Sequence, residues 1–185
     1  MAILEIITAP DPVLKKKAQP VESVDDNIRE IMDNMLETMY HDKGVGLAAN
    51  QVGILKRIIV MDLQDEDDTK RAEGFYPLFM ANPTITDCSK EMIEATEACL
   101  SVPDQNIVVS RHASVKIKYL DYNNESKELE TDGWLARAIQ HETDHLEGKL
   151  LLDYLSPLKK NVAIRKLTKL KKFFRIFIIL YICIN

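Results

Sequence analysis

The segment QHETDH at residues 140–145 constrains the fold of this chain more than any other stretch. Residues four apart lie on one face of an α-helix, so His141 and His145 would point the same way if residues 134–146 form a helix. Two neutral imidazoles at this spacing hold one metal ion, with Glu142 beside it as a candidate general base. A catalytic metal usually keeps three protein ligands, so the fold must bring a third ligand to this helix.

Charge is distributed unevenly along the 185 residues. The chain contains 24 lysines and arginines against 29 acidic residues, yet no acidic residue follows Asp153. Eight basic residues lie in that last stretch: Lys159, Lys160, Arg165, Lys166, Lys169, Lys171, Lys172 and Arg175. We therefore expect an acidic folded body over residues 1–156 and an appended basic helix with an apolar tail over residues 157–185.

The cysteine content and the N-terminus indicate the compartment. Three cysteines do not make a disulfide framework for a chain of this size. The first residues, MAILE, lack the basic and long apolar regions of a secretory signal. We expect a reducing, cytoplasmic setting, in which a free thiolate remains available to bind metal.

Apolar periodicity and helix start signals predict three further helices. Residues 24–39 place apolar side chains three and four apart, with Ser23 as the expected N-cap and Gly44 as the expected terminator. Asp11-Pro12 is a start signal for a short helix to about Lys17. Residues 157–172 read as a basic amphipathic helix, whereas the apolar run over 173–185 is too short to span a membrane.

The middle of the chain reads as strands. We expect strands at 57–63, 78–82, 85–86, 108–109, 113–122 and 127–130, with a first strand or extended arm at 3–8 and a charged loop at 64–73. Pro83 is expected to separate the second strand from the third, and Asn123-Asn124 to form a hairpin turn. Strands without helix alternation predict an α+β fold with mainly antiparallel sheets around the metal-binding helix.

Composition and spacing leave the third ligand open. His41 and His112 stand alone in polar surroundings, which favours a surface or capping role for both. Glu147 and Asp153 are the acidic candidates after His145, but they follow it closely in sequence. Cys99 is the upstream candidate, although a lone cysteine is ordinarily a small buried apolar residue.

Three segments together resemble the peptide deformylase family. They are GVGLAANQ at 44–51, EACLS at 97–101 and QHETDHLEG at 140–148, and their order and separation also resemble the family. The similarity extends from the N-terminus to about residue 170. The resemblance implies a hydrolase that removes the N-formyl group from the N-terminal methionine of newly synthesised proteins and releases formate.

The resemblance also implies a ligand set and a metal. Cys99, His141 and His145 would hold one divalent ion, with water in the fourth position. The family typically uses Fe(II), and Zn(II), Ni(II) or Co(II) substitute; a thiolate with two imidazoles suits such ions. In the family's pattern Glu142 takes a proton from this water and delivers it to the leaving amine.

The remaining implied roles concern the substrate. Gln51 and the backbone N–H of Leu100 would stabilise the oxyanion. Val45, Gly46 and Ala98 would line the path of the formyl-methionyl nascent peptide. By the same resemblance, Glu97 would pair with Arg111 in support of the metal site.

One residue departs from the family's pattern, and two other functions remain open. The family usually has glycine where this chain has Ala98, so a Cβ would cost activity if the position needed positive φ or a close approach of the substrate backbone. An ordinary HExxH metallopeptidase would take its third ligand from Glu147 or Asp153. A non-enzymatic module would bind ribosomal RNA through the basic helix, which is also a candidate ribosome-docking arm for an enzyme; no DNA partner is expected.

Overall fold

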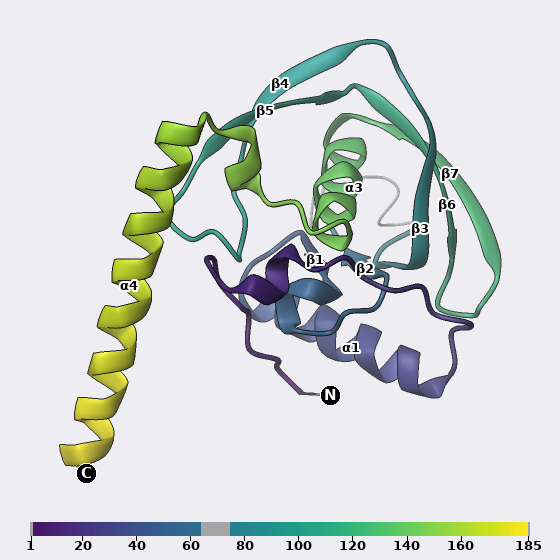
Figure 1. Ribbon diagram of the computed structural model, residues 1–185. Coiled ribbons are helices and arrows are strands. Elements are labelled where there is room, and N and C mark those ends of the chain that lie inside the picture. Colours follow the sequence, from purple (N-terminus) through teal and green to yellow (C-terminus); the bar gives the residue numbers. More distant parts are fainter. Residues whose placement is uncertain (1, 64–74, 185) are drawn as a thin grey trace.

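Residues 2–63 and 75–184 are described by a computed structural model, with side chains described to Lys171 (Figure 1). The main sheet has the strand order β1-β2-β3-β6-β7, and a separate two-stranded ribbon pairs β4 with β5. All of these pairings are antiparallel. The strands are β1 Gly46–Ala48, β2 Ile58–Met61, β3 Leu78–Cys88, β4 Met92–Glu97, β5 Ile107–His112, β6 Ser114–Leu120 and β7 Ser126–Asp132. The α+β expectation is confirmed.

Helices cover both faces of the sheet near β2. The α-helices are α1 Asp26–His41, α3 Gly133–Leu146 and α4 Pro157–Ile184, and the 3-10 helices are η1 Pro12–Lys15, η2 Ala49–Val52 and η3 Leu151–Tyr154. Every residue of β2 is buried. Ile58 and Val60 join a core with α1, whereas Ile59 and Met61 join a core with α3. The period of two therefore places α1 and α3 on opposite faces of the sheet.

The two ends of α1 differ in detail from the expectation. Asp25, not Ser23, is the N-cap, because its side chain accepts a hydrogen bond from the backbone N–H of Ile28. At the other end Lys43 takes the left-handed conformation (φ 57°), while the N–H of Gly44 donates to the carbonyl of Met39. A Cβ on Gly44 would lie 2.9 Å from Leu100 Cδ1, the end of a flexible side chain, so the packing at this glycine is tight.

One strand expectation is corrected, and the alternative left open for residues 3–8 is decided. Residues 78–88 form one strand, because Pro83 lies at a register shift between Ala81 and Thr84 where the ladder to β6 loses its regular pairing. Residues 3–8 form an extended arm and not a strand. The N–H of Ile7 donates a hydrogen bond to the carbonyl of Gln51, which holds the arm against the body. The loop expected at 64–73 lies outside the described residues.

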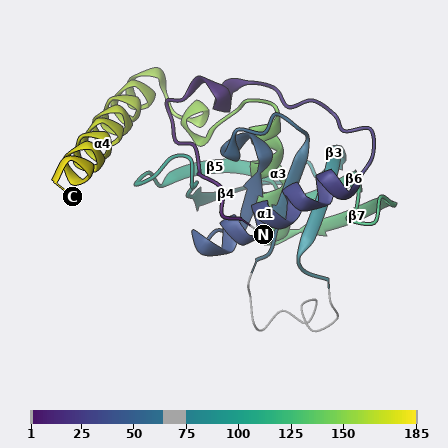
Figure 2. The same cartoon turned by 90° about the horizontal axis from the view of Figure 1, so that it is seen from below.

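Helix α4 leaves the body beside the ribbon (Figures 1 and 2). Its buried side chains, Ala163 and Leu167, join an apolar cluster with Cys99, Val109 and Leu152. The helix runs on to Ile184, beyond the basic stretch expected at 157–172. Within residues 2–63 and 75–184, no helix is long and apolar enough to cross a membrane.

Asp153 connects three elements at the base of α4. Its carboxylate accepts from Lys15, from Lys160 (2.6 Å) and from the backbone N–H of Leu150 (2.8 Å). Burial alone would raise the pKa of Asp153, but the hydrogen bonds from Lys15, Lys160 and Leu150 lower it to about 2. The lowered pKa means that the ionised carboxylate stabilises the folded state.

We therefore expect Asp153→Asn to lower the free energy of unfolding of the metal-stripped protein at pH 7 by about 2 kcal/mol. Because the folded pKa is depressed, this stabilisation is present above the ordinary carboxyl range and is lost as the pH falls from about 4 to 2. Urea denaturation at pH 7 and near pH 2 measures the difference. Glu128→Gln, at an exposed pair with Lys118, is the control; an equal loss in both variants would contradict the expectation.

Candidate metal centre

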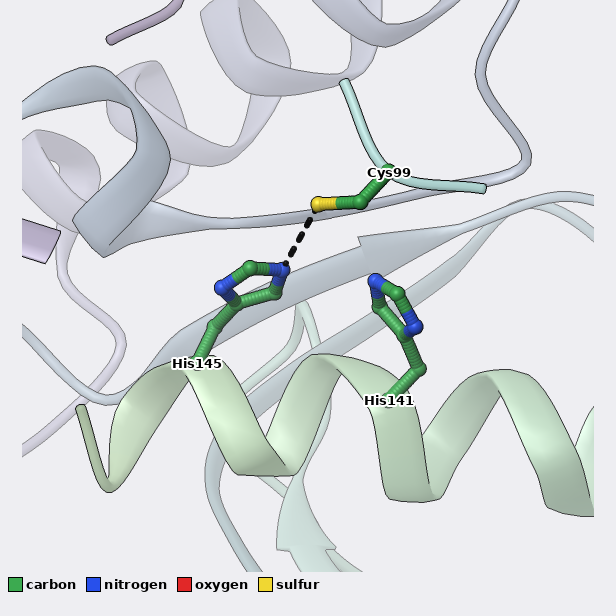
Figure 3. A group of neighbouring side chains, drawn as sticks. All are labelled: Cys99, His141 and His145. Carbon is green, nitrogen blue, oxygen red and sulfur yellow. Dashed lines mark hydrogen bonds between the residues drawn. The ribbon is translucent and has the colours of Figure 1, made fainter. Parts of the chain in front are cut away.

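Helix α3 presents two histidines to a cysteine from another element (Figure 3). His141 and His145 project from one face of α3 toward Cys99, which follows the end of β4. One ligand atom from each residue lies within 4.8 Å of the other two, and Cys99 Sγ lies 3.3 Å from His145 Nε2. Cys99 and His145 are buried, and the His141 side chain is 11% exposed. The fold therefore brings together the three side chains that the resemblance selected.

These three donors fit a divalent metal ion. Ligands bound tetrahedrally at ~2.3 Å (sulfur) and ~2.0 Å (nitrogen) stand about 3.5 Å apart, close to the separation of Cys99 Sγ and His145 Nε2. Burial lowers the pKa of His145, which keeps its imidazole neutral as a ligand must be. Three protein ligands leave a coordination position for a reactant.

Glu142 lies next to His141 in the helix that carries both histidine ligands. It is buried, and its Oε2 makes no hydrogen bond to any described residue. Burial raises the pKa of Glu142 to about 7, against nearby positive charges that lower it. A Cβ on Gly46 would lie 2.5 Å from Glu142 Oε1, so the glycine lets β1 approach the carboxylate. A carboxyl group with this pKa can both accept and return a proton near neutral pH.

Glu97 holds the His141 imidazole through Nδ1, the ring nitrogen that is not the expected metal ligand. Glu97 Oε2 accepts from His141 Nδ1 (2.9 Å), which fixes the imidazole with Nε2 as the free ligand atom. Burial alone would raise the pKa of Glu97, but hydrogen bonds from His141 and Arg111 lower it to about 2. Arg111 also reaches Asp144 at 2.9 Å, so the pairing with Glu97 is part of a larger buried network.

Gln51 and Leu100 lie next to Cys99. The Gln51 side chain is buried; its Oε1 accepts from the N–H of Ala48 (2.8 Å), which directs Nε2 toward Ser101 Oγ (3.2 Å) and Cys99 Sγ (3.7 Å). In the part of the chain that the structure describes, the N–H of Leu100 has no acceptor. The Gln51 amide therefore lies at Cys99 Sγ, and the N–H of Leu100, the residue after Cys99, remains open to an acceptor.

A cleft of about 630 Å³ opens onto this centre. Val45, Gly46 and Ala98 line it together with Cys99, His141 and Glu142. Trp134, at the start of α3, lies at the same cleft with 64% of its surface exposed. A ligand in this cleft would contact β1 on one side and the end of β4 on the other.

The other ligand candidates lie elsewhere. Glu147 pairs with Lys17 and Arg57. Asp153 pairs with lysines at the base of α4. His41 is exposed beside Asp42, and His112 Nδ1 lies 2.7 Å from the carbonyl of Ser89. None of these four belongs to the ligand group, which disfavours the metallopeptidase hypothesis.

Sequence reasoning missed Arg137. This residue is buried and donates to Glu97 Oε1 at 2.7 Å. Its position four before His141 places it on the metal-facing side of α3, and that periodicity was the available signal. An arginine is ordinarily assigned to a solvated face, however, so its burial followed only from the structure.

Comparisons with known proteins agree with this geometry. A family model described as polypeptide deformylase matches residues 3–161. The chain is 57% identical over 171 residues to peptide deformylase 1 of Rickettsia conorii, covering 92% of this chain and 98% of the relative. It is 56% identical over 175 residues to the peptide deformylase of Orientia tsutsugamushi strain Ikeda, with 92% and 97% covered.

Solved structures agree as well. The crystal structure of peptide deformylase from Ehrlichia chaffeensis superposes with a TM-score of 0.86 at 41% identity, covering 93% of this chain and 98% of that one. A second Ehrlichia structure, in complex with actinonin, gives 0.84 at 42% identity, with 91% and 98% covered. This chain belongs to the peptide deformylase family, the enzymes that remove the N-formyl group from nascent peptides.

Proposed function

We propose that Cys99, His141 and His145 hold the catalytic metal of this deformylase and that Glu142 carries the proton. The observation that carries the proposal is the convergence of three ligand atoms within 4.8 Å beside the buried carboxylate of Glu142, whose Oε2 has no hydrogen-bond partner among the described residues. When bound, the metal supplies a Lewis acid at the formyl group and a nucleophilic water at neutral pH. The chain's own residues perform the remaining tasks.

Glu142 acts as general base and then as general acid. Its free oxygen takes the proton of the water that attacks the formyl carbon, and the same proton is delivered to the methionine nitrogen when the C–N bond breaks. One water is consumed, and formate and a free amino group are released. The pKa of about 7 suits both transfers, because neither protonation state of Glu142 is strongly disfavoured at neutral pH.

Gln51 and the N–H of Leu100 stabilise the oxyanion that develops on the formyl oxygen. The bond from the N–H of Ala48 holds the Gln51 amide in place before substrate arrives, as electrostatic preorganisation requires. We expect Gln51→Leu to lower kcat by about a hundredfold with little change in KM. Steady-state kinetics on a formyl-methionyl peptide test this, and an unchanged kcat would contradict the role.

Val45, Gly46 and Ala98 bind the peptide backbone in the cleft. Ala98 is not among the described residues with positive φ, so alanine at this position carries no left-handed strain. We therefore expect Ala98→Gly to leave kcat/KM unchanged and to cost roughly 0.5–1 kcal/mol of stability. Kinetics and urea denaturation of the two proteins check this. A clear gain in kcat/KM would instead mean that the alanine impairs the enzyme.

We propose that the metal bound at this site in the cell is Fe(II). The ligand set of one thiolate and two imidazoles suits Fe(II) and Zn(II) alike, and iron with thiolate would make the enzyme oxygen-sensitive. Protein purified under nitrogen should contain iron and lose formate release in air, whereas the Zn(II)-, Ni(II)- or Co(II)-loaded protein should resist air. Purified protein containing only zinc, with activity indifferent to oxygen, would contradict the assignment.

The basic stretch of α4 is proposed as a ribosome-docking arm appended to the catalytic domain of residues 1–156. Lys160 is engaged with Asp153, but Lys159 and Lys166 have no ion-pair partner in the described structure. A cytoplasmic enzyme that acts on nascent chains gains local substrate by binding the anionic ribosome surface.

Cosedimentation with ribosomes tests the docking arm. Binding should weaken with added salt and should fall in the double variant Lys159→Glu/Lys166→Glu. Lys56→Glu/Lys90→Glu makes the same charge change at exposed positions outside α4 and should leave binding less affected. Salt-insensitive binding, or equal binding by both double variants, would contradict the arm.

A further inference from the structure

Arg137 is buried in the wall of the cleft, and the proposed reaction gives it no task. Its side chain is 7% exposed, and it lies one helical turn before His141 on α3. Arg137 Nη1 donates to Glu97 Oε1 (2.7 Å) and to the carbonyl of Val109 (3.0 Å), and Nη2 donates to the carbonyl of Ile93 (2.5 Å). A buried guanidinium with this many partners restrains the groups that it contacts.

The Glu97 carboxylate is saturated by four donors. Oε1 accepts from Arg111 Nε and Arg137 Nη1, both at 2.7 Å. Oε2 accepts from Arg111 Nη2 (3.0 Å) and His141 Nδ1 (2.9 Å). An ionised carboxylate offers about four lone-pair positions, so these donors together fix its plane. Without Arg137, Glu97 Oε1 loses one of its two donors. The carboxylate plane that orients the hydrogen bond from His141 Nδ1 to Oε2 is then less restrained.

Arg137 also joins the two elements that supply the ligands. Cys99 follows β4, whereas both histidines lie on α3. The carbonyls that Arg137 holds belong to Ile93 of β4 and Val109 of β5, one on each strand of the ribbon. The distance from Cys99 Sγ to the two imidazoles depends on how this ribbon packs against α3. Arg137 connects the two, because it lies on α3 and donates to a carbonyl on each strand of the ribbon.

We propose that Arg137 is a positioning residue of the metal centre. It orients His141 through Glu97, and it fixes the ribbon that leads to Cys99 against the helix that carries the histidines. The inference rests on the proposed ligand set of Cys99, His141 and His145. It predicts a metal that leaves faster when Arg137 is replaced, independently of any effect on catalysis.

The test is metal release from the full chain loaded with Co(II) and challenged with excess chelator. Arg137→Met should release Co(II) about tenfold faster than the parent, within the range for residues that support metal ligands. Its Co(II) absorption bands should shift, because the ligand geometry relaxes. Arg137→Lys, which keeps the charge and one donor toward Glu97, should release at an intermediate rate.

Arg29 is the control for an arginine that holds two backbone carbonyls away from the metal centre, although its side chain is 32% exposed. Arg29 Nη1 donates to the carbonyls of Val24 (2.8 Å) and Tyr122 (3.5 Å), and the guanidinium lies 6.0 Å from the Tyr122 ring centroid. Arg137 similarly holds two carbonyls and lies 5.9 Å from the Trp134 ring, but only Arg137 reaches the metal centre. Arg29→Met should therefore release Co(II) at the parental rate with parental absorption bands.

The outcomes separate this inference from the ligand assignment. Parental release by Arg137→Met, or equal acceleration in Arg29→Met, would overturn the role of Arg137. If Arg137→Met does not fold, Arg137→Lys decides: release faster than the parent supports the role, and parental release overturns it. A parent chain that binds no Co(II) would overturn the ligand set, and this inference with it.

Discussion

Glu142→Gln is expected to lower kcat for formyl hydrolysis by roughly a thousandfold while one metal stays bound per chain. Glutamine keeps the shape of the side chain but cannot accept the proton of the attacking water, and general acid–base catalysis is worth about 10²–10⁴ in rate. Steady-state formate release and metal analysis on the same preparation measure both quantities. Glu142 is not one of the three ligand residues, so metal retention should be unaffected.

The same substitution should stabilise the metal-stripped protein above pH 7. Burial raises the pKa of Glu142 to about 7, so the folded state binds a proton that the unfolded state has released. Ionisation therefore destabilises the fold as the pH rises through this range, and a neutral amide removes that cost. Urea denaturation at pH 8 checks the direction. A variant that keeps parental kcat, or that loses its metal, would refute the role given to Glu142.

Cys99→Ser is expected to weaken metal binding by more than about a hundredfold. Changes that only support metal ligands already cost about 10–100-fold in affinity, and this change replaces a thiolate ligand with a weakly ligating hydroxyl. Chelator competition on the folded protein measures the affinity. Formate release at limiting metal should fall in parallel, because the chain that loses its ion also loses the reaction.

Cys88→Ser is the control for the cysteine. Cys88 is a free, exposed thiol near the end of β3, so its replacement makes the same chemical change away from the cleft. It should leave metal affinity and formate release at parental values. If Cys99→Ser held its metal as tightly as Cys88→Ser did, a two-histidine site completed by another residue would replace the present assignment, as the metallopeptidase hypothesis requires.

The elements with strong local signals could be predicted from the sequence. Apolar residues three and four apart gave α1, and the histidine spacing with the flanking glycine gave α3. The hairpin between β6 and β7 followed from Asn123-Asn124, of which Asn124 has φ 64°. These features depend on residues within a few positions of one another.

Features set by tertiary contacts could not be predicted. Pro83 reads locally as a strand break, but the register shift against β6 accommodates it within one long strand. Ser23 and Asp25 are equally good caps by residue type, and the choice depends on where the chain enters the helix. Both differences arise from partners far away in sequence.

The candidate site, too, could be predicted from the sequence only where its residues lie close together along the chain. The spacing of His141 and His145 predicted that they share a face, but Cys99 lies more than forty residues upstream and was selected by the family resemblance. The four donors around the Glu97 carboxylate come from Arg111 of β5 and from Arg137 and His141 of α3. The spacing of Arg137 from His141 places it on the same face of α3, but nothing local to the sequence shows that it meets Arg111 of β5 at one buried carboxylate.

Formate release by the full chain under three metal conditions tests the central claim most directly. The substrate is an N-formyl-methionyl peptide, and the protein is compared loaded anaerobically with Fe(II), stripped by chelator, and reloaded. The account predicts turnover in the loaded protein, loss on stripping, and recovery that reaches its limit at one metal per chain. Formate release that persists in the stripped protein, or no release from a chain with one bound Fe(II), would contradict it.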